Sequence, residues 1–177
     1  MTLKTIPAAE FSLSVIRAWA DDWFLLTAGQ FHGRDFNAMT VAWGSFGVMW
    51  NKPFAQVVVR PQRHTAGFIT KHNSFTLCAF PESCRKALTL CGTKSGRDTD
   101  KIQEAGLTPI PSTAVAAPGF KEAELIIECR KIYHDRFRPE NFLSPDIAGV
   151  YPAADYHLVL FGEIAAIHGT DKYRRPA

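Results

Sequence analysis

The stretch VVVRPQRHT, residues 57–65, places two arginines and a threonine directly after a run of β-branched residues. Guanidinium groups at the end of a strand, beside a hydroxyl and the first N–H groups of a helix, are the donors that a phosphate group requires. Arg60, Arg63 and Thr65 therefore predict an anion site, with Thr65 as the N-cap of a short helix. The alternative is a strand that ends in solvated charge, and this stretch alone leaves both interpretations open.

A second candidate is CGTKSGRDTDK, residues 91–101, where glycines, hydroxyls and Lys94 precede a short helix. Backbone amides, together with Lys94 and Ser95, would be able to close over an anion. The spacing is not that of a P-loop, since G-x-x-x-x-G-K-[ST] is missing. A solvated turn is the competing interpretation.

His157, in DYHLVLFGE, stands at the start of a strand-like run. It is interpreted as an acid, as a neighbour of a nicotinamide ring or as an edge residue. The other histidines follow no metal-binding spacing, and the cysteines form no C-x-x-C pair, so no metal site is predicted. Ser95 lacks the G-x-S-x-G setting of a hydrolase nucleophile. A chain without an evident acid–base pair or nucleophile is expected if a cofactor supplies the chemistry.

A fourth polar feature is the run NAMTVAWGSFGVMWNKP, residues 37–53. The hydroxyls of Thr40 and Ser45 lie among apolar residues, which indicates either ordinary turn chemistry or the wall of a ligand site. We expect two strands divided between Gly44 and Gly47, or one bulged strand, and Pro53 as the end of the run.

The elements that must position these residues are short. Period-two patterns and β-branched runs predict strands at 21–30, 54–60, 74–80, 122–134 and 156–167. Helical patterns predict helices within 10–22, 81–92 and 98–106, the last with an Asp or Thr as its N-cap and Gly106 as its end. Several strands with short helices and no βαβ rhythm predict a mainly β (α+β) fold, an antiparallel barrel or sandwich with helical insertions.

The composition bounds the class of protein. With 177 residues, of which 46% are hydrophobic and 21% charged, the chain fits one globular domain over residues 1–177. Its net charge of +3 suits an anionic small ligand and does not argue for a nucleic-acid partner. No apolar run is long enough to cross a membrane, and MTLKTIPAAEF lacks the pattern of a secretory signal, so a cytoplasmic protein is expected. The four cysteines are expected in or near a core.

Six segments occur in an order that points to a family: WFLLTAG (23–29), NAMTVAWGSFG (37–47), KPFAQVVVRPQRHT (52–65), SGRDTDK (95–101), EAELIIECRKIY (122–133) and DYHLVLFGEI (155–164). Together they resemble the flavin reductase-like, FMN-binding split-barrel family, and its flavoredoxin-type branch in particular. The resemblance implies a Greek-key split β-barrel, built as a homodimer, with one FMN bound noncovalently to each subunit near the interface.

The resemblance also implies roles for individual residues. The strand after Asn37 would line the flavin ring through Asn37, Met39, Thr40, Val41, Ala42, Trp43 and Ser45. Arg60, Arg63 and Thr65 would bind the phosphate, and Lys94 and Ser95 would close that side. His157 corresponds to a nicotinamide contact, although Asp155-Tyr156-His157 replaces the Gly-Asp-His of related reductases, and His64 stands where this branch commonly has tyrosine.

The function implied is that of an FMN-dependent NAD(P)H oxidoreductase of the flavin reductase type. NADH or NADPH would be the electron donor, and free flavin or a redox protein partner would be the acceptor. The alternatives are a flavoredoxin-like electron carrier and a non-catalytic flavin- or haem-binding module.

Overall fold

An eight-stranded antiparallel sheet forms the centre of the computed structural model, which describes residues 2–176. Seven strands follow the order β3–β2–β6–β9–β10–β5–β4, and β1 pairs with β10. These strands are β1 (Lys4–Thr5), β2 (Phe24–Gln30), β3 (Asp35–Val41), β4 (Gly44–Met49), β5 (Lys52–Val59), β6 (Ser74–Ala79), β9 (Leu125–Arg136) and β10 (Leu158–Gly169). A separate ribbon pairs β7 (Pro109–Ile110) with β8 (Gly119–Phe120).

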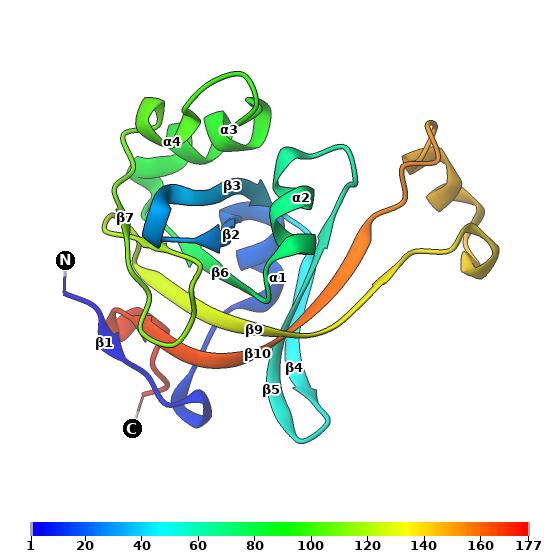
Figure 1. Ribbon diagram of the computed structural model, residues 1–177. Coiled ribbons are helices and arrows are strands. Elements are labelled where there is room, and N and C mark those ends of the chain that lie inside the picture. Colours follow the sequence, from blue (N-terminus) through cyan, green and yellow to red (C-terminus); the bar gives the residue numbers. More distant parts are fainter. Residues whose placement is uncertain (1, 177) are drawn as a thin grey trace.

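The helices are short and lie at the ends and outside of the sheet (Figure 1). They are α1 (Val15–Arg17), which continues as a π-helical turn over Ala18–Asp22, α2 (His64–Lys71), α3 (Arg85–Thr93) and α4 (Lys101–Glu104). The predicted caps of α4 are confirmed: the Asp100 side chain accepts a hydrogen bond from the Gln103 N–H, and Gly106 follows with a φ of 67°.

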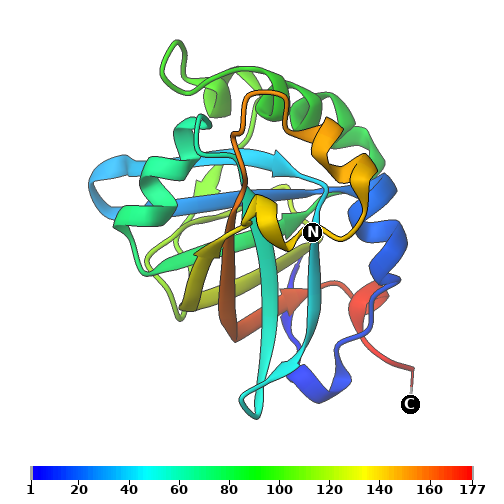
Figure 2. The same ribbon diagram turned by 90° about the vertical axis from the view of Figure 1, so that its right-hand side faces the viewer.

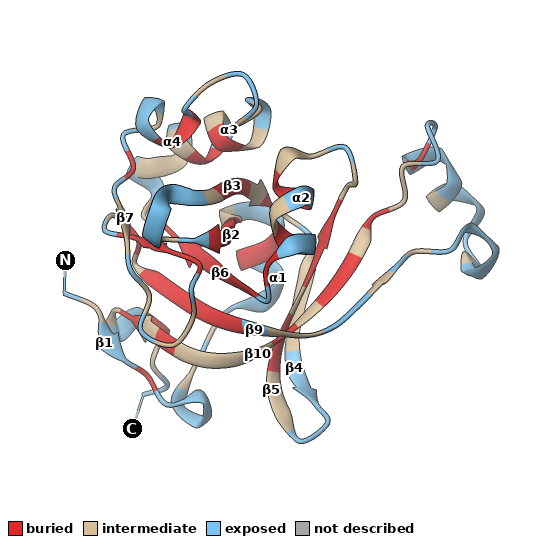
Figure 3. Ribbon diagram, in the orientation of Figure 1, coloured by how far each residue is buried: buried red, intermediate tan, exposed pale blue. Residues whose placement is uncertain are grey.

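The sheet curls into a split barrel because its two edge strands follow one another in the chain. β3 and β4 end the strand order on opposite sides, yet only Ala42 and Trp43 join them. Alternation along the strands fills two cores. Phe24, Leu26 and Ala28 of β2 point into the barrel, and Leu25 points outward to a second core beneath α3. Figure 3 shows that these central strands are buried, and the predicted mainly β, antiparallel fold is confirmed.

Three local predictions were wrong. The run 37–53 divides at Ala42 and Trp43, ahead of the glycines, and turns at Trp50 and Asn51. Pro53 lies inside β5 opposite Val48. A proline fits there because the pairing of β5 with β10 begins only at Phe54, so the missing N–H costs no bond on that side.

Thr65 is the third incorrect prediction, because the N-cap of α2 is Arg63. Thr65 lies in the first turn, where its hydroxyl accepts a hydrogen bond from the Asn37 amide instead of capping the helix.

A long excursion between β9 and β10 leaves the barrel. The arm, residues 137–157, projects to one side in Figure 1 and faces the viewer in Figure 2. It contains two 3₁₀ turns, Pro139–Asn141 and Pro145–Val150, and the side chain of Leu143 is 97% exposed. At its base the Phe137 N–H donates to the His157 carbonyl oxygen, which closes the arm into a loop.

The cysteines of the chain lie in or near the core. Cys78, Cys91 and Cys129 are buried and Cys84 is partly buried, as predicted, and all four thiols are free. Within residues 2–176 no helix has the length and hydropathy that a bilayer span requires. No three His, Cys, Asp or Glu side chains of that same range gather as metal ligands would.

Candidate functional site

Three cations meet where β3, the start of α2 and the loop after α3 come together. The Arg63 guanidinium donates to the Gly92 carbonyl oxygen at 2.7 Å, and the Arg97 guanidinium donates to that of Gln62 at 3.1 Å. The Lys101 ammonium is buried and donates to the carbonyl oxygens of Cys91 and Lys94. None of the ion pairs formed within residues 2–176 includes Arg63, Arg97 or Lys101.

Burial and the neighbouring positive charges lower the pKa values of two groups in this cluster, Lys101 and His64. Burial, together with the charge of Arg63, lowers the pKa of Lys101 to about 8. Burial also lowers the pKa of His64, and the charges of Arg97 and Lys101 lower it further, whereas Asp98 acts in the opposite direction. A bound anion would relieve this repulsion and restore the charged forms. The cluster therefore has the electrostatics of an anion site.

Neutral donors and a close backbone approach complete this end of the site. The buried Asn37 amide donates to the Thr65 hydroxyl at 2.7 Å, which ties β3 to α2. A Cβ at residue 96 would overlap the side-chain Oδ1 of Asn37, so any larger residue would have to displace that buried side chain. A cavity of about 410 Å³ opens beside these groups, and its lining includes Asn37, Arg97 and Lys101 together with Asp98 and the ion pair of Arg34 with Asp100.

A second cavity, of about 210 Å³, lies at the split of the barrel. Its lining is Met39, Thr40, Val41, Ala42, Trp43, Val58, Arg60, Arg63 and His157. Arg63 therefore joins the anion site to this cavity, and the strand β3 runs along both. The Thr40 hydroxyl donates to the Leu88 carbonyl oxygen at 2.5 Å, which holds α3 against this strand.

Arg60 is occupied differently from Arg63. Its guanidinium forms an ion pair with Asp155 at 2.6 Å, donates to the Val150 carbonyl oxygen at 2.9 Å and lies over the Tyr151 ring. Hydrogen bonds from Arg60 and Gln62 lower the pKa of Asp155, which stays ionised. The charge of Arg60 is thus already neutralised, and the residue anchors the arm to the end of β5.

His157 is buried beneath the arm. Its ring lies 5.1 Å from that of Trp43, and its Nδ1 is 2.9 Å from the Tyr151 hydroxyl. Burial, aided by the charge of Arg60, lowers the pKa of His157 to about 4. The imidazole is therefore neutral near pH 7, so it offers a hydrogen bond rather than a proton.

Four of the predicted residues line neither cavity, and one of them, Thr65, lies behind Asn37, whose amide donates to its hydroxyl. Ser45 lies on β4, and its hydroxyl donates to the Gln56 side chain at 2.9 Å. Lys94 pairs with Glu104, and the Ser95 hydroxyl accepts from the Arg97 N–H. Sequence reasoning missed Arg97 and Lys101, although both belong to the stretch 91–101 that drew attention to Lys94.

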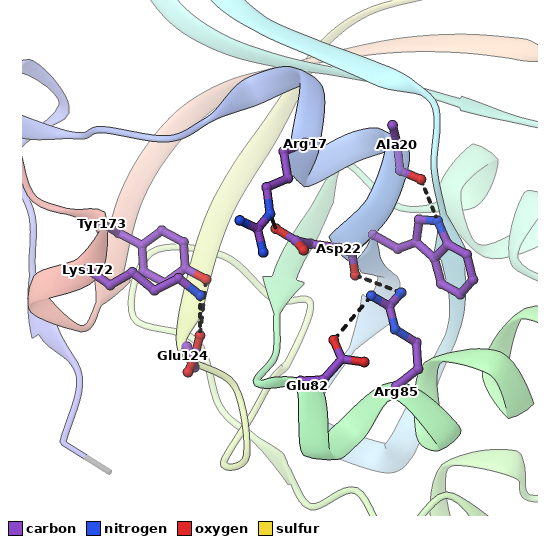
Figure 4. Close-up of polar contacts among 9 residues, drawn as sticks. Arg17, Ala20, Asp22, Glu82, Arg85, Glu124, Lys172 and Tyr173 are labelled. Carbon is purple, nitrogen blue, oxygen red and sulfur yellow. Dashed lines mark hydrogen bonds and ion pairs between the residues drawn. The ribbon is translucent and has the colours of Figure 1, made fainter.

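A further cavity, of about 340 Å³, lies between the N-terminal segment, the start of α3 and the C-terminal turn (Figure 4). Its cations are each matched by a carboxylate: Arg17 by Asp22, Arg85 by Glu82 and Lys172 by Glu124. Arg85 also lies over the Trp23 ring at 4.5 Å. This cavity lacks the uncompensated charge that distinguishes the cluster at α2.

Comparison with known proteins identifies the family. A family model described as "Flavin reductase like domain" matches residues 10–176. An uncharacterized protein of Pyrococcus abyssi is 33% identical over 107 residues, which span 60% of this chain and 59% of that protein.

Solved structures share the fold. Flavoredoxin of Desulfovibrio vulgaris (Miyazaki F) superposes with a TM-score of 0.66 at 22% identity, covering 91% of this chain and 75% of its own. An FMN-binding protein from Thermus thermophilus, solved with bound p-hydroxybenzaldehyde, gives a TM-score of 0.67 at 17% identity. The match covers 95% of this chain and 82% of the T. thermophilus chain. The predicted split barrel is thereby confirmed, and the match over residues 10–176 shows that the chain belongs to the flavin reductase-like family.

Proposed function

We propose that the chain binds FMN noncovalently, with the phosphate at the cations Arg63, Arg97 and Lys101 and the ring in the cavity beside Trp43. The observation that carries the proposal is a set of cations paired only with carbonyl oxygens, next to a cavity that continues along β3. Phosphate is the dianion that such donors accommodate well. The choice of FMN is supported by the protein of the same fold from T. thermophilus, which is an FMN-binding protein.

The chain's own groups divide the work of holding the cofactor. Asn37 and Thr65, which are hydrogen-bonded to each other, would share hydrogen bonds with the phosphate end, and the backbone from Met39 to Trp43 would line the flavin ring. Lys94 and Ser95 would close the phosphate side by leaving their present partners, Glu104 and the Arg97 N–H. Arg60 and Ser45 serve the arm and the β4–β5 hairpin instead.

The proposed activity is that of an NAD(P)H-dependent FMN oxidoreductase. Bound FMN would supply hydride and electron transfer. The chain would orient the reactants and exclude water, tasks that need alignment and no strong acid or base. His157 is neutral, and the residues that line the cavity include no acid–base pair. Both observations agree with a chain that orients the reactants and leaves the chemistry to the cofactor. A flavoredoxin-like electron carrier is the second candidate, because a flavoredoxin shares the fold.

Anaerobic reduction distinguishes the two candidates. Protein saturated with FMN would be mixed with NADH and, separately, with NADPH, and the visible flavin absorbance would be followed. Loss of that absorbance with either nucleotide supports the reductase. A bound flavin that dithionite reduces but neither nucleotide reduces would support the carrier.

We also propose a homodimer, since the ring cavity is incomplete. Its volume of about 210 Å³ is below the ~300–1,000 Å³ of ordinary ligand sites. A larger apolar groove of about 880 Å³ opens along the arm and includes Trp43, Phe137, Phe142 and Val150. A second copy seated on this groove would supply the missing wall.

Light scattering tests this assembly. Leu143→Asp, at an exposed apolar side chain next to Phe142 of this groove, should shift the mass toward a monomer. Ile16→Asp, at another exposed apolar side chain, is the matched control. A wild-type monomer at all concentrations would refute the homodimer.

A further inference from the structure

The Tyr151 hydroxyl is held in a fixed position against His157. Tyr151 is buried in the arm, its ring stacks parallel to that of Phe142 with centroids 5.8 Å apart, and the Arg60 guanidinium lies over it. The hydroxyl is 2.9 Å from Nδ1 of His157. Since Asp155 and the Val150 carbonyl in turn hold Arg60, the whole arrangement is anchored at the end of β5.

The position of the shared proton follows from the available partners. Burial raises the pKa of Tyr151 and lowers that of His157, so a neutral phenol meets a neutral imidazole. If the phenol donates to Nδ1, the ring proton must lie on Nε2. In the opposite tautomer Nδ1–H would donate to the phenol oxygen, and the phenol proton would have no acceptor within residues 2–176. An unsatisfied buried donor is costly, so the first arrangement is favoured.

We propose that Tyr151 is a positioning residue that holds His157 as the Nε2–H tautomer, which offers one hydrogen bond to a carbonyl oxygen of a ligand in the cavity beside Trp43. The assignment rests on the proposed function, because the ligand is the nicotinamide carboxamide or a carbonyl of the flavin ring. His157 lines that cavity, and Nδ1 is occupied, so Nε2 is the ring nitrogen left for a ligand. The interaction is a hydrogen bond, and no proton is transferred.

The Nε2–H group of His157 should remain a hydrogen-bond donor, and its ring should remain neutral, throughout the neutral pH range. The groups that face His157 from the packed elements are Arg60 at the end of β5 and Tyr151 and Asp155 of the arm, while Trp43 and Phe137 carry no titrating group. Arg60 opposes protonation of His157, and Asp155 favours it less strongly. A general acid, by contrast, would have to gain and lose a proton in this range.

Nitrogen-15 NMR on the flavin-free chain tests the tautomer. Long-range proton–nitrogen correlations should show His157 as a single Nε2–H form. Tyr151→Phe removes only the hydroxyl and should give a mixture of tautomers, whereas Tyr156→Phe, a neighbouring tyrosine in the same arm, should leave the His157 signals unchanged. A wild-type Nδ1–H form, or an unchanged spectrum in Tyr151→Phe, would overturn the inference.

Binding measurements then identify the carbonyl. If it belongs to the nicotinamide, Tyr151→Phe should raise KM for the nucleotide about two- to tenfold while leaving the Kd for FMN unchanged. If it belongs to the flavin, the Kd for FMN should rise by that factor. No change in either constant would refute the ligand role. Because the NMR experiment needs no cofactor, failure to bind FMN would reject the proposed function and leave the tautomer result standing.

Discussion

Arg63 offers the sharpest perturbation of the proposed phosphate site. Its guanidinium is partly buried and bonded to one carbonyl oxygen, that of Gly92, so it has donors left for a ligand. Arg60, three residues earlier, is paired with Asp155 at 2.6 Å. The two arginines should therefore respond differently to replacement, although the sequence pattern assigns them the same role.

The expected magnitude follows from the bonds lost. A charge-assisted hydrogen bond contributes about 1.5–3 kcal/mol. Arg63→Ala should accordingly raise the Kd for FMN about 10- to 150-fold. Fluorescence titration with both FMN and riboflavin isolates the phosphate, because the two ligands differ only there. The variant should lose affinity for FMN while its affinity for riboflavin stays near that of the wild type.

The control is Arg130→Ala. Arg130 also donates to a carbonyl oxygen, that of Ala114, but lines neither cavity of the site. It should leave both affinities unchanged. Equal losses of FMN and riboflavin affinity in Arg63→Ala, or no loss at all, would refute the assignment of Arg63 to the phosphate.

Three further predictions concern Lys101, His157 and Arg60. The Lys101 pKa is about 8 in the folded chain against 10.5 in the unfolded one, so the unfolded chain binds more protons between these values. The free energy of unfolding should therefore rise with pH between these two values. Chemical denaturation at several pH values should show that this rise is absent in Lys101→Met. The His157 pKa falls from 6.5 to about 4 on folding, so its contribution to stability should decline as pH drops through that window, and denaturation of His157→Gln should show a flatter profile. Arg60→Met should speed hydrogen exchange in residues 137–157 and change the Kd for FMN less than Arg63→Ala does; equal exchange rates would contradict the anchoring role.

Much of the fold could be predicted because its signals are local. The alternation in residues 122–134 corresponds to β9, and the Asp100 and Gly106 caps to α4. Pro53 and Thr65 misled because their roles depend on partners far along the chain. Pro53 is tolerated because β5 has no β10 partner at that residue, and Thr65 does not cap the helix because its hydroxyl accepts a hydrogen bond from Asn37. Residue spacing in the sequence does not encode either tertiary contact.

The sequence indicated which stretches come together, and it indicated less well which of their side chains are available to a ligand. Residues 37–43, 57–65 and 91–101 converge, with Arg63 at their junction. Whether a cation is free depends on its neighbours: Asp155 neutralises Arg60, and Glu104 neutralises Lys94. Lys101 looked like an ordinary helical lysine, and only burial reveals it as part of the cluster.

Equilibrium binding of FMN to the purified chain tests the central claim most directly. The account predicts saturable binding of one FMN per chain, with quenched flavin fluorescence and an affinity that falls as salt screens the cluster of Arg63, Arg97 and Lys101. Competition by inorganic phosphate should be measurable and weak. A chain that shows no saturable binding of FMN, or binds riboflavin as tightly as FMN, would contradict it.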